Sequence, residues 1–488
     1  MTNIAQLVRE RIIRPPGLPH DKPSKSVWQE PPHATVADWQ SRDLPVEVDV
    51  VVIGSGITGC AVAHALLHDS SNTSLRVCVL EARQAVSGAT GRNGGHLISD
   101  SGSLAVPLLP IIGEEAAREI VQFSEANIRC VKSLVAQLDK DAQEAVELRE
   151  VVATAAFEDD GMFQEAKGGL EQLKSLWPEN PIQGNVLETQ GDTKVQYISS
   201  TNQKFRGILE QHGAAALWPY KLITALLGNL LNDFPERFSL ETNTPALRID
   251  YKTGDDVPYQ ISTPRGTLRA RNVVHCTNGF TGHLIPKLVG AIYPIRGTMS
   301  AQEPGTSFPL LGDKTSWSWF TKPSFDPATQ VYSTGLYYAQ QNAKTGRIFI
   351  GGEQQKITTI LSSDDSVVSD EAQASLQSAL PGLLTDVQPL GEQRIWSGIM
   401  GFSSDGLPLV GRLDAATTGR GGHGEWIAAG FNGHGMDKCW LSGKAIAEMI
   451  LGRETPEYLP KTFVLNAERM KRLGADQSVS NMMEMLSV

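Results

Sequence analysis

The stretch VDVVVIGSGITGCAVAHALL, residues 48–67, decides the fold. Its first residues are apolar and β-branched, which predicts a buried strand, and its last residues are small and apolar, which predicts a closely packed helix. The turn between them has the GxGxxG spacing of a dinucleotide-binding unit. The first glycine permits the tight turn, the second lets the backbone approach a pyrophosphate and the third lets the helix pack on the strand; these are Gly54, Gly56 and Gly59. The helix would begin near Ile57 and Thr58 and point its free N–H groups at the phosphates.

The next stretch, LRVCVLEARQAVSGATGRNGGHL, residues 75–97, continues this unit. A second predicted strand ends at Glu81, 22 residues after Gly59. A carboxylate at that place can accept hydrogen bonds from the ribose of a dinucleotide. Ala82 and Arg83 follow directly, and we expect them beside the cofactor as well. On these residues alone, an NAD site and an FAD site are both open.

The composition is that of an ordinary soluble globular protein, with 41% hydrophobic and 20% charged residues among 488. This length allows two or more subdomains. The net charge of -11 argues against nucleic-acid or anionic-membrane partners, and no window has the roughly 20 uninterrupted apolar residues of a membrane span. Five scattered cysteines without a CxxC pair predict a reducing interior and no metal site. We therefore expect a cytoplasmic protein, and import into an organelle stays open because the N-terminus is mildly basic.

Segments typical of a nucleotide-binding fold alternate along the chain with other helices and strands. Apolar residues at helical spacing predict a long helix over 113–140, and the helix predicted at 217–234 returns to the nucleotide-binding fold. The predicted class is α/β (α+β overall), a Rossmann-like cofactor domain interleaved with a mixed-sheet substrate domain. The predicted boundaries are an N-terminal arm at 1–45, the cofactor domain at 46–100, 200–290 and 395–455, the substrate domain at 101–199 and 291–394, and a C-terminal tail at 456–488.

Three further segments carry glycine or small polar residues where a strand would end, and we expect them at the cofactor. They are the loop SGATGRNGGH, the end of the strand RNVVHCTNG and the turn GFNGHGM, which opens a last helix. The dipole of that helix would stabilise negative charge on the cofactor. A flexible surface loop and a plain helix cap are the alternatives. The residues expected to bind the cofactor are Gly88, Ala89, Thr90, Arg92, Asn93, Gly94, Gly95, His96 and Leu97 in the loop, Thr277, Asn278 and Gly279 after the strand, and Gly401, Gly433, His434, Gly435 and Met436 near the last turn.

Together these motifs resemble the D-amino-acid-oxidase-like superfamily of FAD-dependent oxidoreductases, which contains glycine, sarcosine and γ-glutamylputrescine oxidases. Over about residues 46–455, four motifs follow the order of that family, and the loop looks most like that of fungal members. The resemblance implies an FAD-binding domain and oxidation of a C–H bond next to nitrogen, with hydride passing to flavin N5. It also implies a small amine or amino-acid substrate and O₂ as the usual acceptor. The four motifs are GSGITG with Glu81, SGATGRNGGH (87–96), SDGLPLVG (404–411) and GFNGHGM (430–436).

The resemblance further indicates that FAD is held without a covalent bond. Sarcosine-oxidase-like relatives attach flavin through a cysteine seven residues before the aspartate of an SxDGxP-type segment. In this chain Asp405 is preceded at that spacing by Gly398. In relatives with histidyl-linked flavin, a histidine lies near the position of Arg92, which cannot form that bond. His96 is expected to act as a hydrogen-bonding residue.

The segment around Tyr337 and Tyr338 departs from those relatives. Sarcosine-oxidase-like enzymes carry a YYG segment followed by a lysine, used for O₂ activation, and by a histidine. Aligning the tyrosines places Phe349 at the lysine and Glu353 at the histidine. We expect Tyr338 and Glu353 to be catalytic, with Glu353 pairing with a cationic amine; a solvated glutamate at a strand end is the alternative.

Arg296 and His434 complete the catalytic candidates. Arg296 would either bind a substrate carboxylate bidentately or hold the interface between the domains. His434 lies in the last glycine turn, where it would face the flavin. The predicted function is an FAD-dependent amine or amino-acid oxidoreductase, with an oxidase favoured. The alternatives are a dehydrogenase or desaturase of a larger nitrogenous metabolite and an FAD-binding assembly factor without catalysis.

Overall fold

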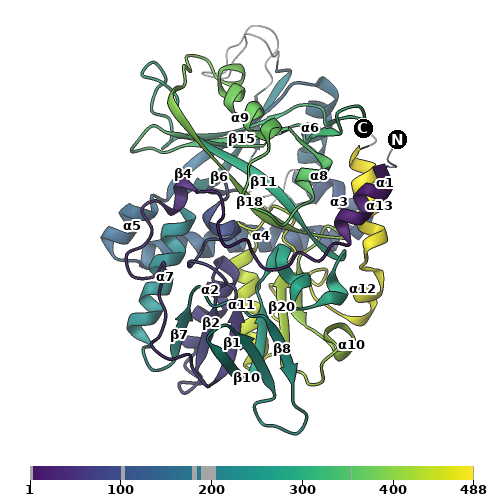
Figure 1. The fold of residues 1–488 in the computed structure, drawn as a ribbon. Coiled ribbons are helices and arrows are strands. Elements are labelled where there is room, and N and C mark those ends of the chain that lie inside the picture. The colour runs from purple at the N-terminus through teal and green to yellow at the C-terminus, as the bar shows by residue number, and fades with distance from the viewer. Residues whose placement is uncertain (1–3, 100–104, 178–183, 188–204, 353, 487–488) are drawn as a thin grey trace.

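Two large β-sheets, one above the other in Figure 1, organise the chain. The structure is a computed structural model. It describes residues 4–99, 105–177, 184–187, 205–352 and 354–486.

The lower sheet contains the opening strand β1 (Glu47–Ile53), whose residues Val50, Val51 and Val52 are fully buried. Parallel pairing joins β1 to β2 and β10, β2 to β7 and β10 to β20, in the order β19-β20-β10-β1-β2-β7. Parallel strands buried on both faces read as continuous apolar runs, as β1 does. The other strands are β2 (Val77–Leu80), β7 (Phe238–Glu241), β8 (Arg248–Tyr251), β9 (Tyr259–Thr263), β10 (Gly266–His275), β19 (Leu409–Arg412) and β20 (Glu425–Ala429).

Helices α2 (Ile57–Leu67), α7 (Pro219–Asp233) and α11 (Cys439–Ile450) pack together and share one core with this sheet. Helices α2 and α11 lie so close that a Cβ atom on Gly443 would lie 2.5 Å from the Thr58 carbonyl oxygen. Small residues on α2 permit this approach. The helix expected over 217–234 is therefore confirmed as α7.

The upper sheet runs in the order β18-β11-β16-β15-β12-β4-β6-β3, with β5 paired to β6. It mixes parallel and antiparallel pairs, and a small third sheet, β13-β14-β17, lies outside it. Strands β3, β6 and β18 belong to the upper sheet although the sequence assigned their segments to the cofactor domain. The strands are β3 (His96–Leu97), β4 (Arg149–Phe157), β5 (Gly184–Leu187), β6 (Gly207–Ala216), β11 (Ile292–Glu303), β12 (Thr315–Phe320), β13 (Ser324–Asp326), β14 (Val331–Ser333), β15 (Leu336–Gln341), β16 (Ile348–Gly351), β17 (Gln354–Lys356) and β18 (Leu390–Ser403).

The amphipathic helix predicted over 113–140 is confirmed as α4 (Glu114–Gln137), whose buried face includes Ile120, Ile128 and Val135. Parallel strands with crossover helices, joined to a mixed sheet, confirm the predicted α/β class. The remaining helices are α3 (Ala105–Ile112), α5 (Lys140–Val146), α6 (Asp160–Leu176), α8 (Ile357–Ile360), α9 (Asp370–Leu383), α10 (Ala415–Thr418) and α12 (Ala467–Arg472), with 3₁₀ turns η1 (Val27–Gln29), η2 (Ala89–Gly91), η3 (Asn278–His283) and η4 (Pro286–Leu288). Within the described ranges, no helix is both long and apolar enough to traverse a bilayer.

The two ends of the chain meet beside the upper sheet (Figure 1). Helix α1 (Ile4–Ile12) packs on α13 (Ala475–Leu486), and Arg9 of α1 pairs with Asp476 of α13. Both helices share an apolar cluster with Ile295 of β11. The first turns of the chain are thus anchored, and the arm between α1 and β1 is held at both of its ends.

Candidate functional site

The carboxyl ends of β1, β10 and β20 meet at one edge of the lower sheet, where the sequence predicted the cofactor. Gly54 follows β1 with a φ of +109°, and a Cβ atom there would lie 2.6 Å from the Cys276 carbonyl oxygen. A Cβ atom on Gly59 would lie 1.8 Å from the Gly54 carbonyl oxygen. Both positions exclude any side chain, because the obstructing atoms belong to the backbone. The turn therefore has the close packing that the GxGxxG spacing predicts.

The start of α2 and the end of β2 are joined by hydrogen bonds. The Glu81 carboxylate, 9% exposed, accepts from the Ser55 N–H at 3.1 Å and from the Ser55 hydroxyl at 2.7 Å. The first helical N–H, that of Ile57, donates to Thr90 Oγ1 at 3.1 Å. Gly56 faces the same hydroxyl, since its Cβ atom would lie 3.0 Å from it. These contacts gather the predicted phosphate-binding and ribose-binding groups around one turn.

The last glycine turn lies against the end of β10. The Gly430 N–H donates to Asn278 Oδ1 at 3.1 Å, and a Cβ atom on Gly401 would lie 2.5 Å from the same oxygen. From the loop, the Asn93 amide donates to Met436 Sδ at 3.3 Å. Three predicted segments that are far apart in the sequence therefore form one site.

The remaining predicted cofactor residues lie around this site or behind it. Gly433 approaches Met400, and the His434 N–H donates to the Phe431 carbonyl oxygen at 2.9 Å. Thr58 is different, because its side chain bonds Cys439 of α11 and so faces away from the turn. Leu97 pairs with Ala215 in the upper sheet. Near them lie Ala82, Gly88, Ala89, Gly94, Gly95, Thr277, Gly279 and Gly435.

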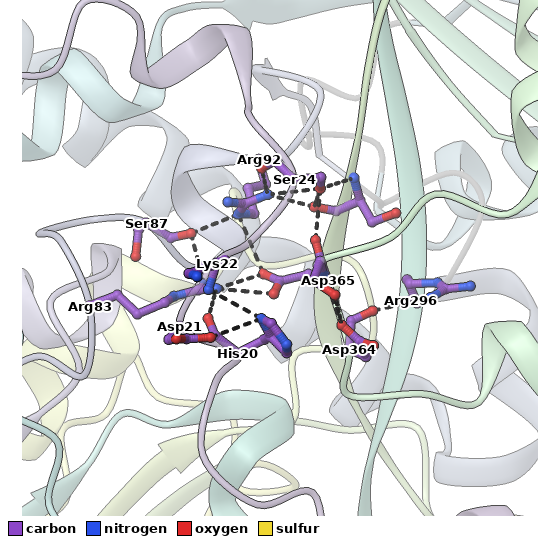
Figure 2. A network of polar contacts seen from close by, with 12 residues as sticks. His20, Asp21, Lys22, Ser24, Arg83, Ser87, Arg92, Arg296, Asp364 and Asp365 are labelled. Carbon is purple, nitrogen blue, oxygen red and sulfur yellow. Dashed lines mark hydrogen bonds and ion pairs between the residues drawn. The ribbon is translucent and has the colours of Figure 1, made fainter.

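The two arginines of the cofactor segment bind protein groups (Figure 2). Arg83 Nη1 donates to both carboxylate oxygens of Asp365 at 3.0 Å. Arg92 donates through Nε to the Ser87 carbonyl oxygen at 2.7 Å and through Nη1 to the Ser397 carbonyl oxygen at 2.8 Å. Burial lowers the pKa of Arg92 to about 10, although Asp365 opposes that shift. Arg92 therefore joins the cofactor loop (residues 87–96) to β18 of the upper sheet, and Arg83 joins the segment after β2 to Asp365, which lies between α8 and α9.

Tyr338, one of the catalytic candidates, contacts the cofactor loop. A Cβ atom on Gly94 would lie 2.6 Å from its ring, and its ring centroid is 5.9 Å from that of His96. Burial lowers the pKa of His96 to about 4, against a hydrogen bond with the Ala339 backbone that raises it. His96 is therefore uncharged at neutral pH.

Arg296 lies at the edge of the polar network in Figure 2. It is 3% exposed, and Nη1 donates to the Asp364 carbonyl oxygen at 3.2 Å. Both roles that the sequence left open for Arg296 stay predictions. Glu353, the other carboxylate predicted to be catalytic, lies outside the described residues.

Two residues that sequence reasoning missed belong to this region. Ser55 stands between the first two glycines of the turn, so the motif itself could have suggested it. Asp365 accepts a hydrogen bond from Arg83, which lies 282 positions earlier in the sequence, and no local sequence pattern marks that pairing. Such a contact follows only from the fold.

This chain belongs to the family of FAD dependent oxidoreductases, whose model matches residues 49–449. It is 23% identical over 412 residues to the probable oxidoreductase OrdL of Rhizobium meliloti, with 84% of each chain covered. It is 20% identical over 430 residues to the gamma-glutamylputrescine oxidoreductase of Escherichia coli, covering 85% of this chain and 86% of that protein.

Solved structures of similar fold include the glycine oxidase of Geobacillus kaustophilus, with a TM-score of 0.62 and 18% identity over 86% of this chain and 99% of that one. The L-proline dehydrogenase of P. horikoshii has a TM-score of 0.61 and 20% identity over 86% and 98%. At these identities the likeness concerns the fold.

The cofactor is therefore FAD, and the observed groups fit it. The glycine turn leaves no room for side chains where a pyrophosphate would approach, and the buried Glu81 carboxylate retains acceptor capacity for ribose hydroxyls. Gly398 offers no thiol, and its Cβ position faces Arg92 at 3.0 Å. Nothing among the described residues suggests a covalent bond to FAD.

Proposed function

We propose that this protein oxidises a carbon–nitrogen bond of a small amine or amino acid, with O₂ as the electron acceptor. Bound FAD supplies the hydride acceptor, at N5. The observation that carries the proposal is the contact of Tyr338 with Gly94, since it brings a polar side chain of the upper sheet onto the cofactor loop. The name of one relative, a gamma-glutamylputrescine oxidoreductase, supports an amine as the substrate class.

The surroundings of this contact favour a neutral amine. Phe349 and Trp396 are buried within the core that Tyr338 also contacts, and His96 is uncharged. A low-polarity environment penalises an ammonium group and lowers the pKa of an amine. An amine must lose its proton before it can release hydride from the neighbouring carbon. In this proposal Tyr338 positions the substrate and the apolar side chains exclude water.

The test is anaerobic addition of a panel of primary amines, secondary amines and amino acids to the yellow protein. Loss of the visible flavin absorption with one member is the expected result, followed by hydrogen peroxide when air is readmitted. Failure of every member to bleach the flavin, with dithionite still bleaching it, would contradict the proposal.

A dehydrogenase is the second candidate, because aligning the tyrosines predicts Phe349 at the position where sarcosine-oxidase-like relatives have the lysine used with O₂. Its ring is 2% exposed and stacks on Trp28, so no cationic side chain occupies that place. Rapid bleaching followed by slow reoxidation in air, and fast reoxidation by a dye, would favour this candidate over the oxidase.

A further inference from the structure

The N-terminal arm, here residues 13–45, passes along both sheets before it enters β1. Beside the upper sheet, the Ser24 N–H donates to the Asp365 carbonyl oxygen at 2.8 Å. Beside the lower sheet, the Ala37 carbonyl oxygen accepts from the Ala85 N–H at 2.9 Å. The arm therefore runs past the segment 75–97, from its glycine-rich loop (residues 87–96) to the end of β2.

Five consecutive carbonyl oxygens of the cofactor loop, from Gly91 to Gly95, each accept a hydrogen bond from outside the loop. The arm provides the donors for two of them. Ser26 Oγ and Gln29 Nε2 reach Gly91 at 2.7 and 3.0 Å, and Trp28 Nε1 reaches Asn93 at 2.5 Å. The others are Trp396 Nε1 to Arg92 at 2.9 Å, Gln340 Nε2 to Gly94 at 3.1 Å and the Leu217 N–H to Gly95 at 2.9 Å.

Two N–H groups of the same loop, those of Asn93 and Gly94, are available to a ligand. The N–H groups of Gly91, Arg92 and Gly95 donate to the Gly88 carbonyl oxygen, the Ala89 carbonyl oxygen and Asn93 Oδ1. Throughout the described ranges, no acceptor is in hydrogen-bonding position for the N–H groups of Asn93 and Gly94, although Gly94 is buried. Buried N–H groups are normally paired. A loop whose carbonyl groups all turn to protein donors presents positive dipole ends on its other side, which attracts an anionic or electron-rich ligand.

Trp28 is the residue that fastens the arm to this loop. It is 2% exposed, and its ring stacks on Phe349 with centroids 3.9 Å apart and planes 14° apart. Trp218 meets the ring edge-on at 5.0 Å and donates from Nε1 to the Trp28 carbonyl oxygen at 2.6 Å. Since ring and backbone are both fixed, the indole N–H is pre-aligned with the Asn93 carbonyl oxygen.

The cofactor segment in turn holds the arm, as Figure 2 shows. Arg92 Nη1 donates to the Ser24 carbonyl oxygen at 2.8 Å, and Arg83 Nη1 donates to the His20 carbonyl oxygen at 3.1 Å. Asp365, 1% exposed, lies between the two guanidinium groups. Arm and loop are therefore mutually ordered, and displacing one leaves buried polar groups of the other unpaired.

We propose that the N-terminal arm is a part of the FAD site and that Trp28 is a positioning residue. By holding the Asn93 carbonyl oxygen, Trp28 orients the Gly94 N–H of the same peptide unit toward FAD, and the bonds of Ser26 and Gln29 to the Gly91 carbonyl oxygen fix the start of the loop. The Asn93 N–H belongs to the peptide unit of the Arg92 carbonyl, which Trp396 holds. The inference rests on the FAD cofactor and is independent of the substrate that is oxidised. The arm then controls how long FAD stays bound and how strongly the site stabilises negative charge on the reduced ring.

The experiment compares Trp28→Phe with Trp39→Phe in the full-length, FAD-loaded protein. Both change the same residue type in the same arm, and Trp39 is 37% exposed. FAD release is followed by the rise of free-FAD fluorescence without substrate, together with the visible flavin absorption band. Because Trp28→Phe keeps the stacking and removes the N–H, we expect release about fivefold faster and a shifted band, as loss of one hydrogen bond implies. Trp39→Phe should match the wild type.

Ser26→Ala is the second variant, because it removes one of the two donors to the Gly91 carbonyl oxygen, Gln29 being the other, and replaces no aromatic side chain. It also removes the acceptor of the Trp28 backbone N–H. It should also accelerate release, which supports the proposal even if Trp28→Phe does not fold. Urea unfolding of each holoprotein separates positioning from general stability. If both variants are less stable yet keep the wild-type release rate and band, the arm has only a structural role and the proposal is overturned. A wild type that carries no FAD would overturn the cofactor assignment as well.

Discussion

The cofactor loop Gly91–Gly95 and the strand pair β15–β16 touch each other but are built on different principles. The loop works through its backbone, since its carbonyl groups are bound by protein and its glycines admit no side chains. The strand pair works through side chains, and neighbouring residues face opposite ways. Tyr338 contacts Gly94, whereas the Tyr337 hydroxyl lies 2.5 Å from Ser375 Oγ on α9. A site built from backbone groups can be predicted from the spacing of glycines in the sequence. A site built from side chains cannot be predicted in that way, because it depends on which face of the strand each residue occupies.

The largest expected effect comes from breaking the backbone site. Gly59→Ala should abolish FAD binding, because the added Cβ atom would lie 1.8 Å from the Gly54 carbonyl oxygen. Gly168→Ala in α6 is the matched control, since this helical glycine lies outside the site and nothing lies within 4 Å of its Cβ position. The measurement is the ratio of flavin to protein absorbance after purification. If the Gly59→Ala protein is yellow and has its full content of FAD, the close backbone contact at Gly59 is not required for FAD binding.

His96, at the contact between loop and upper sheet, should make stability depend on pH. Its pKa is about 4 in the folded protein and 6.5 ordinarily, so between these values the unfolded chain binds more protons. The stabilisation is complete above pH 6.5 and is lost as the pH falls toward 4, by at most about 3 kcal/mol. In urea titrations across this pH range, the free energy of unfolding of His96→Gln should fall less with decreasing pH than that of the same change at the exposed His423. If the free energies of unfolding of the two variants change equally with pH, His96 does not cause the pH dependence of stability.

The smallest expected effect tests the side-chain site. Tyr338→Phe should lower kcat/KM about fivefold with the best substrate, as expected for one lost polar contact. Tyr337→Phe should leave it within about twofold, because its hydroxyl bonds α9 and not the loop. Steady-state kinetics at saturating acceptor give both values. Equal losses of kcat/KM in the two variants would mean that the opposite orientation of the two side chains on β15 does not give them different roles.

The sequence was sufficient for the α/β class, the family, FAD and the glycine turn, because each rests on short-range spacing. It could not place the arginines, since Arg83 pairs with Asp365 across 282 positions. It also left two roles open for Arg296, which bonds the Asp364 carbonyl oxygen, and both stay predictions. Trp28 belongs to no motif of the sequence. Its bond to Asn93 requires knowing that β16 and α7 enclose the indole.

The pairing of α1 with α13 has a consequence for the arm that lies between α1 and β1. Tethered at both ends, a displaced arm remains close to the cofactor loop, and its effective concentration there is set by its own short contour. A free peptide of the same sequence would have to reach millimolar concentration to compete with it. Each opening of the arm should therefore be brief. Cutting the chain between α1 and Trp28 would leave the arm attached at β1 alone, and each opening should then last longer.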